Sequence, residues 1–149
     1  MKLAKVLPML AVSAFCLAGC ASKVDYAKFH EEALNVKQHS FKKASVNVDS
    51  QSEIAGISTS VKGTVKYIYN GGWQIDAEDQ SGAALKAAAS LYIAMTAAAV
   101  SEEDGLEYYA GGSFKVVNKE NKVTTEFNGF GLLTSYKSDN TKVKISYSK

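Results

Sequence analysis

From residue 41 to the C-terminus, apolar and polar residues alternate with a period of two in several stretches. This period is typical of β-strands that bury one face and expose the other. In the segment 57–70, the face predicted to be buried carries Ile57, Thr59, Val61, Val65, Tyr67 and Tyr69. Turn signals such as Asn70-Gly71-Gly72 separate the stretches. The pattern predicts about seven antiparallel strands, three before residue 76 and four after residue 105.

Two glycines interrupt one of these predicted strands. The segment 106–118 reads LEYYAGGSFKVVN, with Gly111 and Gly112 in its interior. Glycine inside a strand weakens the pairing and favours an irregular backbone. We expect a β-bulge or a sharp bend at this point.

A helical period appears in residues 25–37, before the alternating stretches. Tyr26, Phe29, Ala33 and Val36 recur at helical spacing, and charged or amide residues occupy the opposite side. This spacing predicts an amphipathic helix near the N-terminus.

The segment 81–100, SGAALKAAASLYIAMTAAAV, carries one charge, Lys86. Alanine has the highest helix propensity, so a second helix is predicted here. On a helical projection the large residues share one side and the small residues the other, which a membrane span has no reason to do. We expect the large side to face the sheet. It then either fills the sheet's concavity or covers a cavity lined by apolar side chains.

Together these elements predict one α+β domain over residues 24–149. Its sheet is an antiparallel meander of about seven strands that can curve, and both helices lie on its buried face. The order of elements is helix, three strands, helix, four strands, with no internal repeat or low-complexity linker between them.

The N-terminus reads MKLAKVLPMLAVSAFCLAGC. Two lysines, a short apolar run and then small residues are typical of a secretory signal. The ending Leu17-Ala18-Gly19-Cys20 resembles the lipobox of bacterial lipoproteins. The resemblance implies that residues 1–19 are removed by cleavage after Gly19 and that Cys20 is acylated. Residues 20–23 would then be the lipidated cysteine and a short tether.

This resemblance also implies a location. The protein would be exported and held by its lipid at the outer face of the cytoplasmic membrane, or at the outer membrane of a Gram-negative source. Two or three acyl chains give lasting attachment, whereas one is marginal. Cys16 would leave with the signal, so the mature chain would have no free thiol for a disulfide, a thiolate metal site or a nucleophile.

Composition excludes several other function classes. The 17 basic residues of the 149-residue chain are all lysines, and the net charge of +2 comes from Lys2 and Lys5 in the predicted signal. Without a guanidinium fork or a basic surplus, nucleic acid is not an expected partner. His30 and His39 do not have a short metal-ligand spacing. We predict no metal site, no cofactor, no catalytic residues and no enzyme activity.

Aromatic and large apolar residues are the remaining candidates for a site. They form either the packed core or the lining of an apolar cup, and the residues assigned to it are Tyr67, Trp73, Leu85, Leu91, Tyr92, Met95 and Phe127. The order of elements resembles that of the LolA/LolB and LppX/LprG lipoprotein carriers. In those families a half-barrel holds acyl chains under helical lids, which implies a bound lipid or another hydrophobic ligand.

Three functions compatible with a membrane-anchored protein follow. The first is a non-enzymatic binding or interaction module at the membrane surface. The second is a carrier of a lipid or hydrophobic ligand in a LolA/LppX-like cup. The third is a structural subunit of an envelope complex, whose partner would be another envelope protein.

Overall fold

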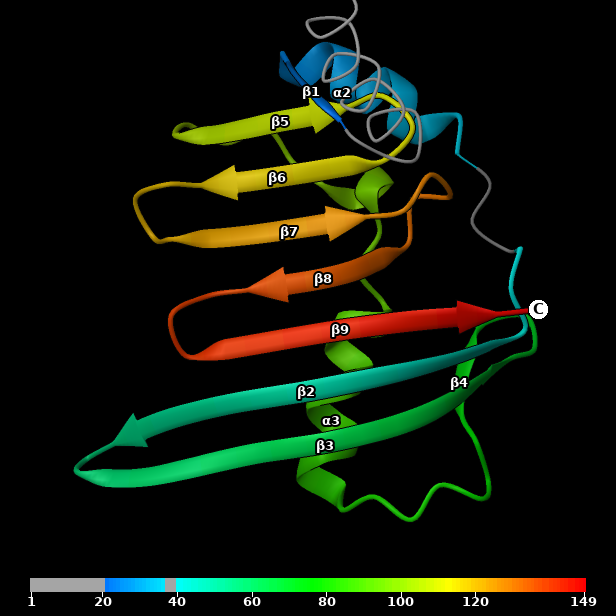
Figure 1. Ribbon diagram of the computed structural model, residues 1–149, viewed down its shortest axis with the longest axis vertical. Coiled ribbons are helices and arrows are strands. Elements are labelled where there is room, and N and C mark those ends of the chain that lie inside the picture. Colours follow the sequence, from blue (N-terminus) through cyan, green and yellow to red (C-terminus); the bar gives the residue numbers. More distant parts are fainter. Residues whose placement is uncertain (1–20, 37–39) are drawn as a thin grey trace, which may run out of the picture.

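A computed structural model describes residues 21–36 and 40–149. The described residues form one open antiparallel sheet of nine strands in the order β1-β5-β6-β7-β8-β9-β2-β3-β4 (Figure 1). The strands are β1 (Ser22–Val24), β2 (Lys43–Ile54), β3 (Ile57–Tyr69), β4 (Trp73–Ile75), β5 (Leu106–Ala110), β6 (Phe114–Asn118), β7 (Val123–Phe127), β8 (Leu133–Lys137) and β9 (Thr141–Ser148). The α+β class and the antiparallel sheet are therefore confirmed.

The prediction of about seven strands was too low for two reasons. The first is β1, whose first two residues lie in the segment assigned to the tether. The second is the double glycine, which makes a hairpin turn between β5 and β6 rather than a bulge. Gly111 and Gly112 have φ values of 134° and 99°, which only glycine adopts readily.

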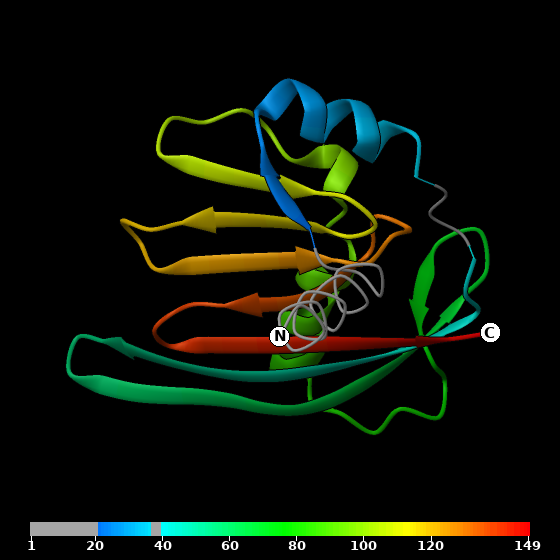
Figure 2. The same ribbon diagram turned by 45° about the horizontal axis from the view of Figure 1, so that its top comes forward.

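Two helices and a short 3-10 turn lie on one face of the sheet (Figure 2). They are α2 (Tyr26–Leu34), α3 (Ala83–Ile93) and η1 (Ala97–Ala99). Residues that pair across neighbouring strands show how the covered face is built. One such row consists of Tyr108, Val116, Thr125, Tyr136, Val143 and Val48. These side chains are buried or half-buried, whereas lysines, serines and threonines line much of the opposite, uncovered face.

Helix α2 packs at the β1 end of the sheet. The side chain of Asp25 caps it by accepting a hydrogen bond of 2.8 Å from the backbone N–H of Lys28. Two residues of the helix, Phe29 and Ala33, are fully buried. The helix ends at Leu34, with Asn35 as its C-cap, before the predicted limit of residue 37, which lies outside the described residues.

Helix α3 is shorter than predicted and presents a different side to the sheet. It ends at Ile93 because the next backbone segment pairs elsewhere: Thr96 bridges to Leu132 and the N–H of Ala97 donates to the carbonyl of Gly131. The buried helix positions are Ala89 and Ile93, while Leu91 is 72% exposed. The expectation that the whole large-residue side faces the sheet was therefore wrong.

Close approach between helix and sheet explains this outcome. A Cβ at Gly63 of β3 would lie only 2.7 Å from Cδ2 of Leu85, so the missing side chain at Gly63 makes room for Leu85. The hydroxyls of Tyr67 and Ser90 lie 2.8 Å apart between β3 and α3. The fully buried helix residue next to this polar pair is a small one, Ala89.

Ser22 and Lys23, which the sequence assigned to the short tether over residues 20–23, belong to β1. Lys23 pairs in register with Tyr109, and its Nζ lies 3.0 Å from Oε1 of Glu107. Lys119 places its Nζ 3.1 Å from the same oxygen. Hydrogen bonds from Lys23 and then Lys119 lower the pKa of Glu107. The chain therefore joins the sheet from Ser22 onward.

The acid strength of Glu107 leads to a prediction about pH. With its pKa lowered in the folded state, its contribution to stability is present above about pH 4.3, the ordinary pKa of glutamate. That contribution is lost as the pH falls through the lowered value. We expect the urea midpoint of the wild type to exceed that of Glu107→Gln near neutral pH, and the two to converge in acid. A difference that stays constant with pH would contradict an ionised Glu107 as its source.

The signal residues, Gly19, Cys20 and His39 lie outside the described residues. Within residues 21–36 and 40–149, no helix reaches the length and apolarity that crossing a membrane requires.

Candidate functional site

The residues assigned to an apolar cup are not arranged alike. Tyr67 and Phe127 are buried in the core. Trp73, Leu85, Tyr92 and Met95 are half-buried and pack against that core. Leu91 points to solvent on the outer side of α3 and belongs to neither a cup nor the core.

Contacts among these residues are those of a packed interior. The rings of Tyr92 and Tyr136 lie 5.1 Å apart, centroid to centroid, between α3 and β8. Burial raises the pKa of Tyr92 and of Tyr67, so both hydroxyls stay protonated near neutral pH. These groups offer side-chain packing and weakly polar hydroxyls, and no nucleophile or charge for chemistry.

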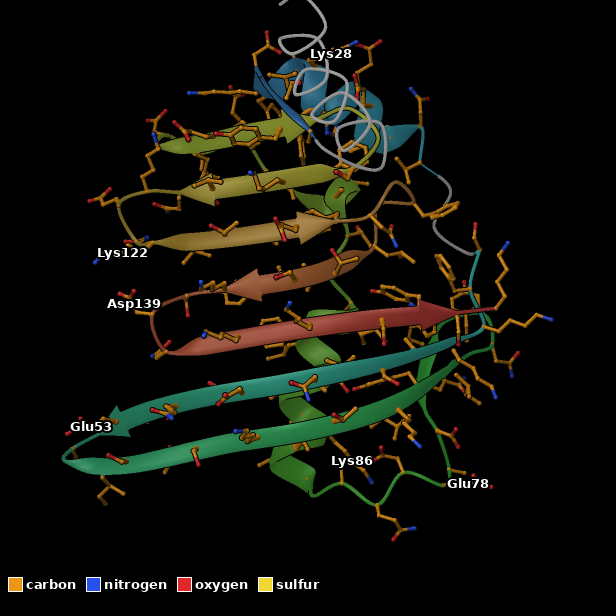
Figure 3. All side chains as sticks on the ribbon, viewed as in Figure 1. Lys28, Glu53, Glu78, Lys86, Lys122 and Asp139 are labelled. Carbon is orange, nitrogen blue, oxygen red and sulfur yellow. The ribbon has the colours of Figure 1, made fainter. Side chains whose placement is uncertain are left out.

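A second feature is a long hairpin that extends past the rest of the sheet. Strand β2 pairs with β9 as far as Ser50 and Thr141, and the N–H of Gln51 still donates to the carbonyl of Asn140 at 2.8 Å. From Ser52 to Thr59, β2 and β3 pair only with each other in the described chain. Four further register pairs, at about 3.4 Å per residue, project roughly 14 Å. Every residue from 51 to 60 is exposed. We call residues 51–60 the hairpin arm. Its tip, marked by Glu53, extends farther than the neighbouring turns (Figure 3).

The tip of the hairpin arm is apolar. Ile54 and Ile57 are directly paired, and they are 72% and 67% exposed. The turn between them consists of Ala55 and Gly56, with φ values of 53° and 77°. Positive φ at both central residues matches the twist of the flanking strands. Two isoleucines are thus held side by side at the end of a projecting ribbon.

Polar side chains stiffen the hairpin arm and its base. The hydroxyls of Ser52 and Thr59 lie 2.7 Å apart, and those of Ser50 and Thr141 lie 2.8 Å apart. Closer to the sheet, Nδ2 of Asn47 donates to Oγ1 of Thr64 at 2.9 Å. Cross-strand hydroxyl and amide pairs of this kind stabilise a sheet face without burying apolar surface.

The outer side of β3 is an open strand edge. On the side away from β2, β4 pairs only with Tyr67–Tyr69 in the described chain. Next to β4, the loop 76–81 covers two more positions. Asp79 accepts from the N–H of Lys66 at 2.8 Å, and the hydroxyl of Ser81 donates to the carbonyl of Thr64 at 3.0 Å. The first of these bonds lowers the pKa of Asp79.

The uncovered part of this edge follows from the period of the strand. Thr64 and Lys66 direct their backbone groups outward, and in an antiparallel strand every second residue does so. Ser58, Ser60 and Lys62 therefore also present outward N–H and C=O groups, and no strand of the described chain pairs with them. We call the backbone of these three residues the free edge. Such an edge can hydrogen-bond an added strand.

The sequence pattern did not reveal the hairpin arm. The alternation of Ile57, Thr59 and Val61 predicted a half-buried face, but Ile57 is largely exposed because the helices do not extend over the arm. The signals that could have revealed it are the Ala55-Gly56 pair, which can form a tight turn, and the serine and threonine content on both sides of it.

In the described part of the chain, no group of three or more histidine, cysteine, aspartate or glutamate residues is placed to hold a metal ion. The chain matches no protein-family model, no curated protein and no solved structure. The geometry of the hairpin arm and the free edge is therefore the main guide to function.

Proposed function

We propose that this protein is an exported, lipid-anchored and non-enzymatic interaction module that binds a partner protein in the cell envelope through its hairpin arm and free edge. The observation that carries the proposal is the projection of residues 51–60 beyond the sheet, with Ile54 and Ile57 exposed at the tip. Apolar side chains held out on a stiff ribbon suit insertion into a partner's pocket.

The free edge suggests how the partner is held. Outward N–H and C=O groups at Ser58, Ser60 and Lys62 can pair with an extended segment of another protein, which becomes an added strand. Main-chain hydrogen bonds would supply affinity, and the isoleucine tip would supply selectivity for an apolar side chain. The residues from 54 to 61 carry no charge, so desolvating them costs less than desolvating a charged edge.

An interaction module is preferred to a lipid carrier because side chains pack against one another between α3 and the sheet. Leu85 packs against Gly63, Ala89 is fully buried, and Tyr92 packs on Tyr136. Acyl chains would need a continuous apolar cavity at this interface.

The test is site-specific photo-crosslinking in living cells. A benzophenone amino acid at position 58, on the free edge, is expected to give a discrete adduct with another envelope protein. The same probe at position 146, exposed on the uncovered sheet face of β9, is expected to give none. The adduct should disappear in Ser60→Pro, because proline removes an outward N–H that the β2–β3 ladder does not use.

Ser60→Ala is the matched control, since alanine keeps the N–H and should keep the adduct. The double variant Ile54→Ser, Ile57→Ser should weaken the adduct while the urea midpoint changes little, because both side chains are exposed. Recovery of only the monomer at position 58, or an adduct that survives Ser60→Pro, would argue against the proposal.

A further inference from the structure

The chain enters the sheet at a defined end. Ser22, the first residue of β1, pairs with Ala110, the last residue of β5. Because neighbouring strands are antiparallel throughout, the same end holds the last residues of β3, β7 and β9 and the first residue of β2. The C-terminus follows β9 at this end (Figure 1). One residue, Ala21, separates β1 from residues 1–20, which lie outside the described structure. We call this the anchor end.

Five aromatic side chains gather at the anchor end, and we call them the aromatic cluster: Phe41, Tyr69, Trp73, Phe130 and Tyr147. The centroid distances that connect them run from 5.1 Å (Tyr69 to Trp73) to 5.7 Å (Trp73 to Tyr147). Its members come from the segment before β2, the ends of β3, β4 and β9, and the turn between β7 and β8.

Part of the aromatic cluster faces solvent. Phe130 is 39% exposed, and Phe41, Tyr69 and Trp73 are half-buried. Beside them Lys42 is exposed and is fixed by its backbone, whose N–H donates to the carbonyl of Ser148 at 3.0 Å. Tryptophan and tyrosine are favoured at membrane–water interfaces, where one end of the ring is apolar and the other is hydrated. A lysine beside them can reach lipid phosphates.

The proposed anchor and the aromatic cluster share one end of the sheet. From β1 to the turn that carries Phe130 is about four strand spacings, or roughly 19 Å. The hairpin arm projects from the opposite end. An acyl group at Cys20 therefore brings the aromatic cluster to the level of the headgroups when the strands stand upright on the membrane.

We infer that the aromatic cluster is a membrane-contact surface that sits in the lipid interface and directs the hairpin arm away from the bilayer. This inference rests on the lipid anchor of the proposed function. It adds a second contact with lipid and fixes the orientation in which the free edge meets its partner. The occupant of the surface is the headgroup region of the bilayer that holds the acyl chains.

Trp73 makes the inference testable, because it is the only tryptophan of the chain. The mature lipidated protein is reconstituted in vesicles of phosphatidylethanolamine and phosphatidylglycerol with brominated acyl chains. We expect the emission of Trp73 to shift to shorter wavelength and to lose intensity relative to vesicles without bromine. The control is Trp73→Phe combined with Ile57→Trp, which moves the fluorophore to the exposed tip of the hairpin arm and should show neither effect.

A second variant distinguishes contact of the aromatic cluster with lipid from attachment of the protein through its proposed acyl chains. Phe130→Ser changes an exposed ring, so the fold should persist, and it should reduce the quenching of Trp73 while the protein still co-sediments with vesicles. If the protein co-sediments but Trp73 is not quenched, or if quenching at positions 73 and 57 is equal, the inferred membrane contact and orientation are wrong while the lipid anchor stands. Failure of the wild type to co-sediment overturns the lipid anchor as well.

Discussion

Replacing Phe29 by alanine is expected to lower the free energy of unfolding by about 3–5 kcal/mol, the range for a fully buried phenylalanine. Phe29 is 0% exposed and joins α2 to the sheet. Its ring lies 5.3 Å from that of Tyr108 on β5 and 5.6 Å from that of Phe114 on β6, centroid to centroid. The loss should appear in urea unfolding as a lower midpoint with an unchanged slope.

Leu34→Ala is the matched control on the same helix. Leu34 is 61% exposed, and alanine and leucine are both strong helix formers, so a change within about 0.5 kcal/mol is expected. If the two variants lost equal stability, the burial of Phe29 beneath α2 would be wrong. If Phe29→Ala lost nothing, α2 would contribute little to the folded state.

Replacing Cys20 by alanine is expected to abolish membrane attachment through lipid. The proposed acyl chains are attached to the sulfur of Cys20, and the removal of residues 1–19 depends on that modification in proteins with a lipobox. We expect the variant to retain its signal residues and to lack the mass of the acyl groups. The mass of the intact chain reports both changes in one measurement.

Cys16→Ala is the control, because Cys16 lies within the proposed signal and would be removed from the mature protein. The mature mass of this variant should equal that of the wild type. A Cys20→Ala chain with the same mature mass as the wild type would refute acylation at Cys20.

The strands that the sequence predicted well are those whose alternation coincides with real burial. In β9, Val143 and Ile145 are buried while Lys142 and Lys144 are exposed, so the pattern and the structure agree. Strand β1 has no such pattern, because three residues carry one apolar side chain, Val24. Its position is fixed by pairing with β5, which local sequence does not encode.

Helix α3 shows a different limit of pattern reading. Helical projection assumes that the largest residues face the interior, yet Leu91 is exposed and Ala89 is fully buried. The deciding factor is the distance between helix and sheet near Gly63, where the strand has no side chain. Such a distance depends on two segments about 25 residues apart in the sequence and is not contained in either alone.

Among the candidate site residues, two are buried. Tyr67 and Phe127 are core residues, as one of the two readings had them. The hairpin arm was missed because exposed strands have no buried face for alternation to mark, and its serines and threonines bond to one another across the ribbon. A strand segment that projects into solvent is only weakly marked by hydrophobic periodicity.

The pairing of β1 with β5 also bears on the order of events during synthesis and the proposed export. Lys23 and Glu107 are 84 residues apart in the chain, so loop-closure entropy makes this contact a late one in folding. If the chain is exported as proposed, Ser22–Val24 has no strand to join until residues 106–110 have crossed the membrane, and Cys20 would be modified while these residues are unpaired. Once β5 is available, the same residues become the border strand of the sheet. Acylation would therefore come before the fold closes over its own attachment point.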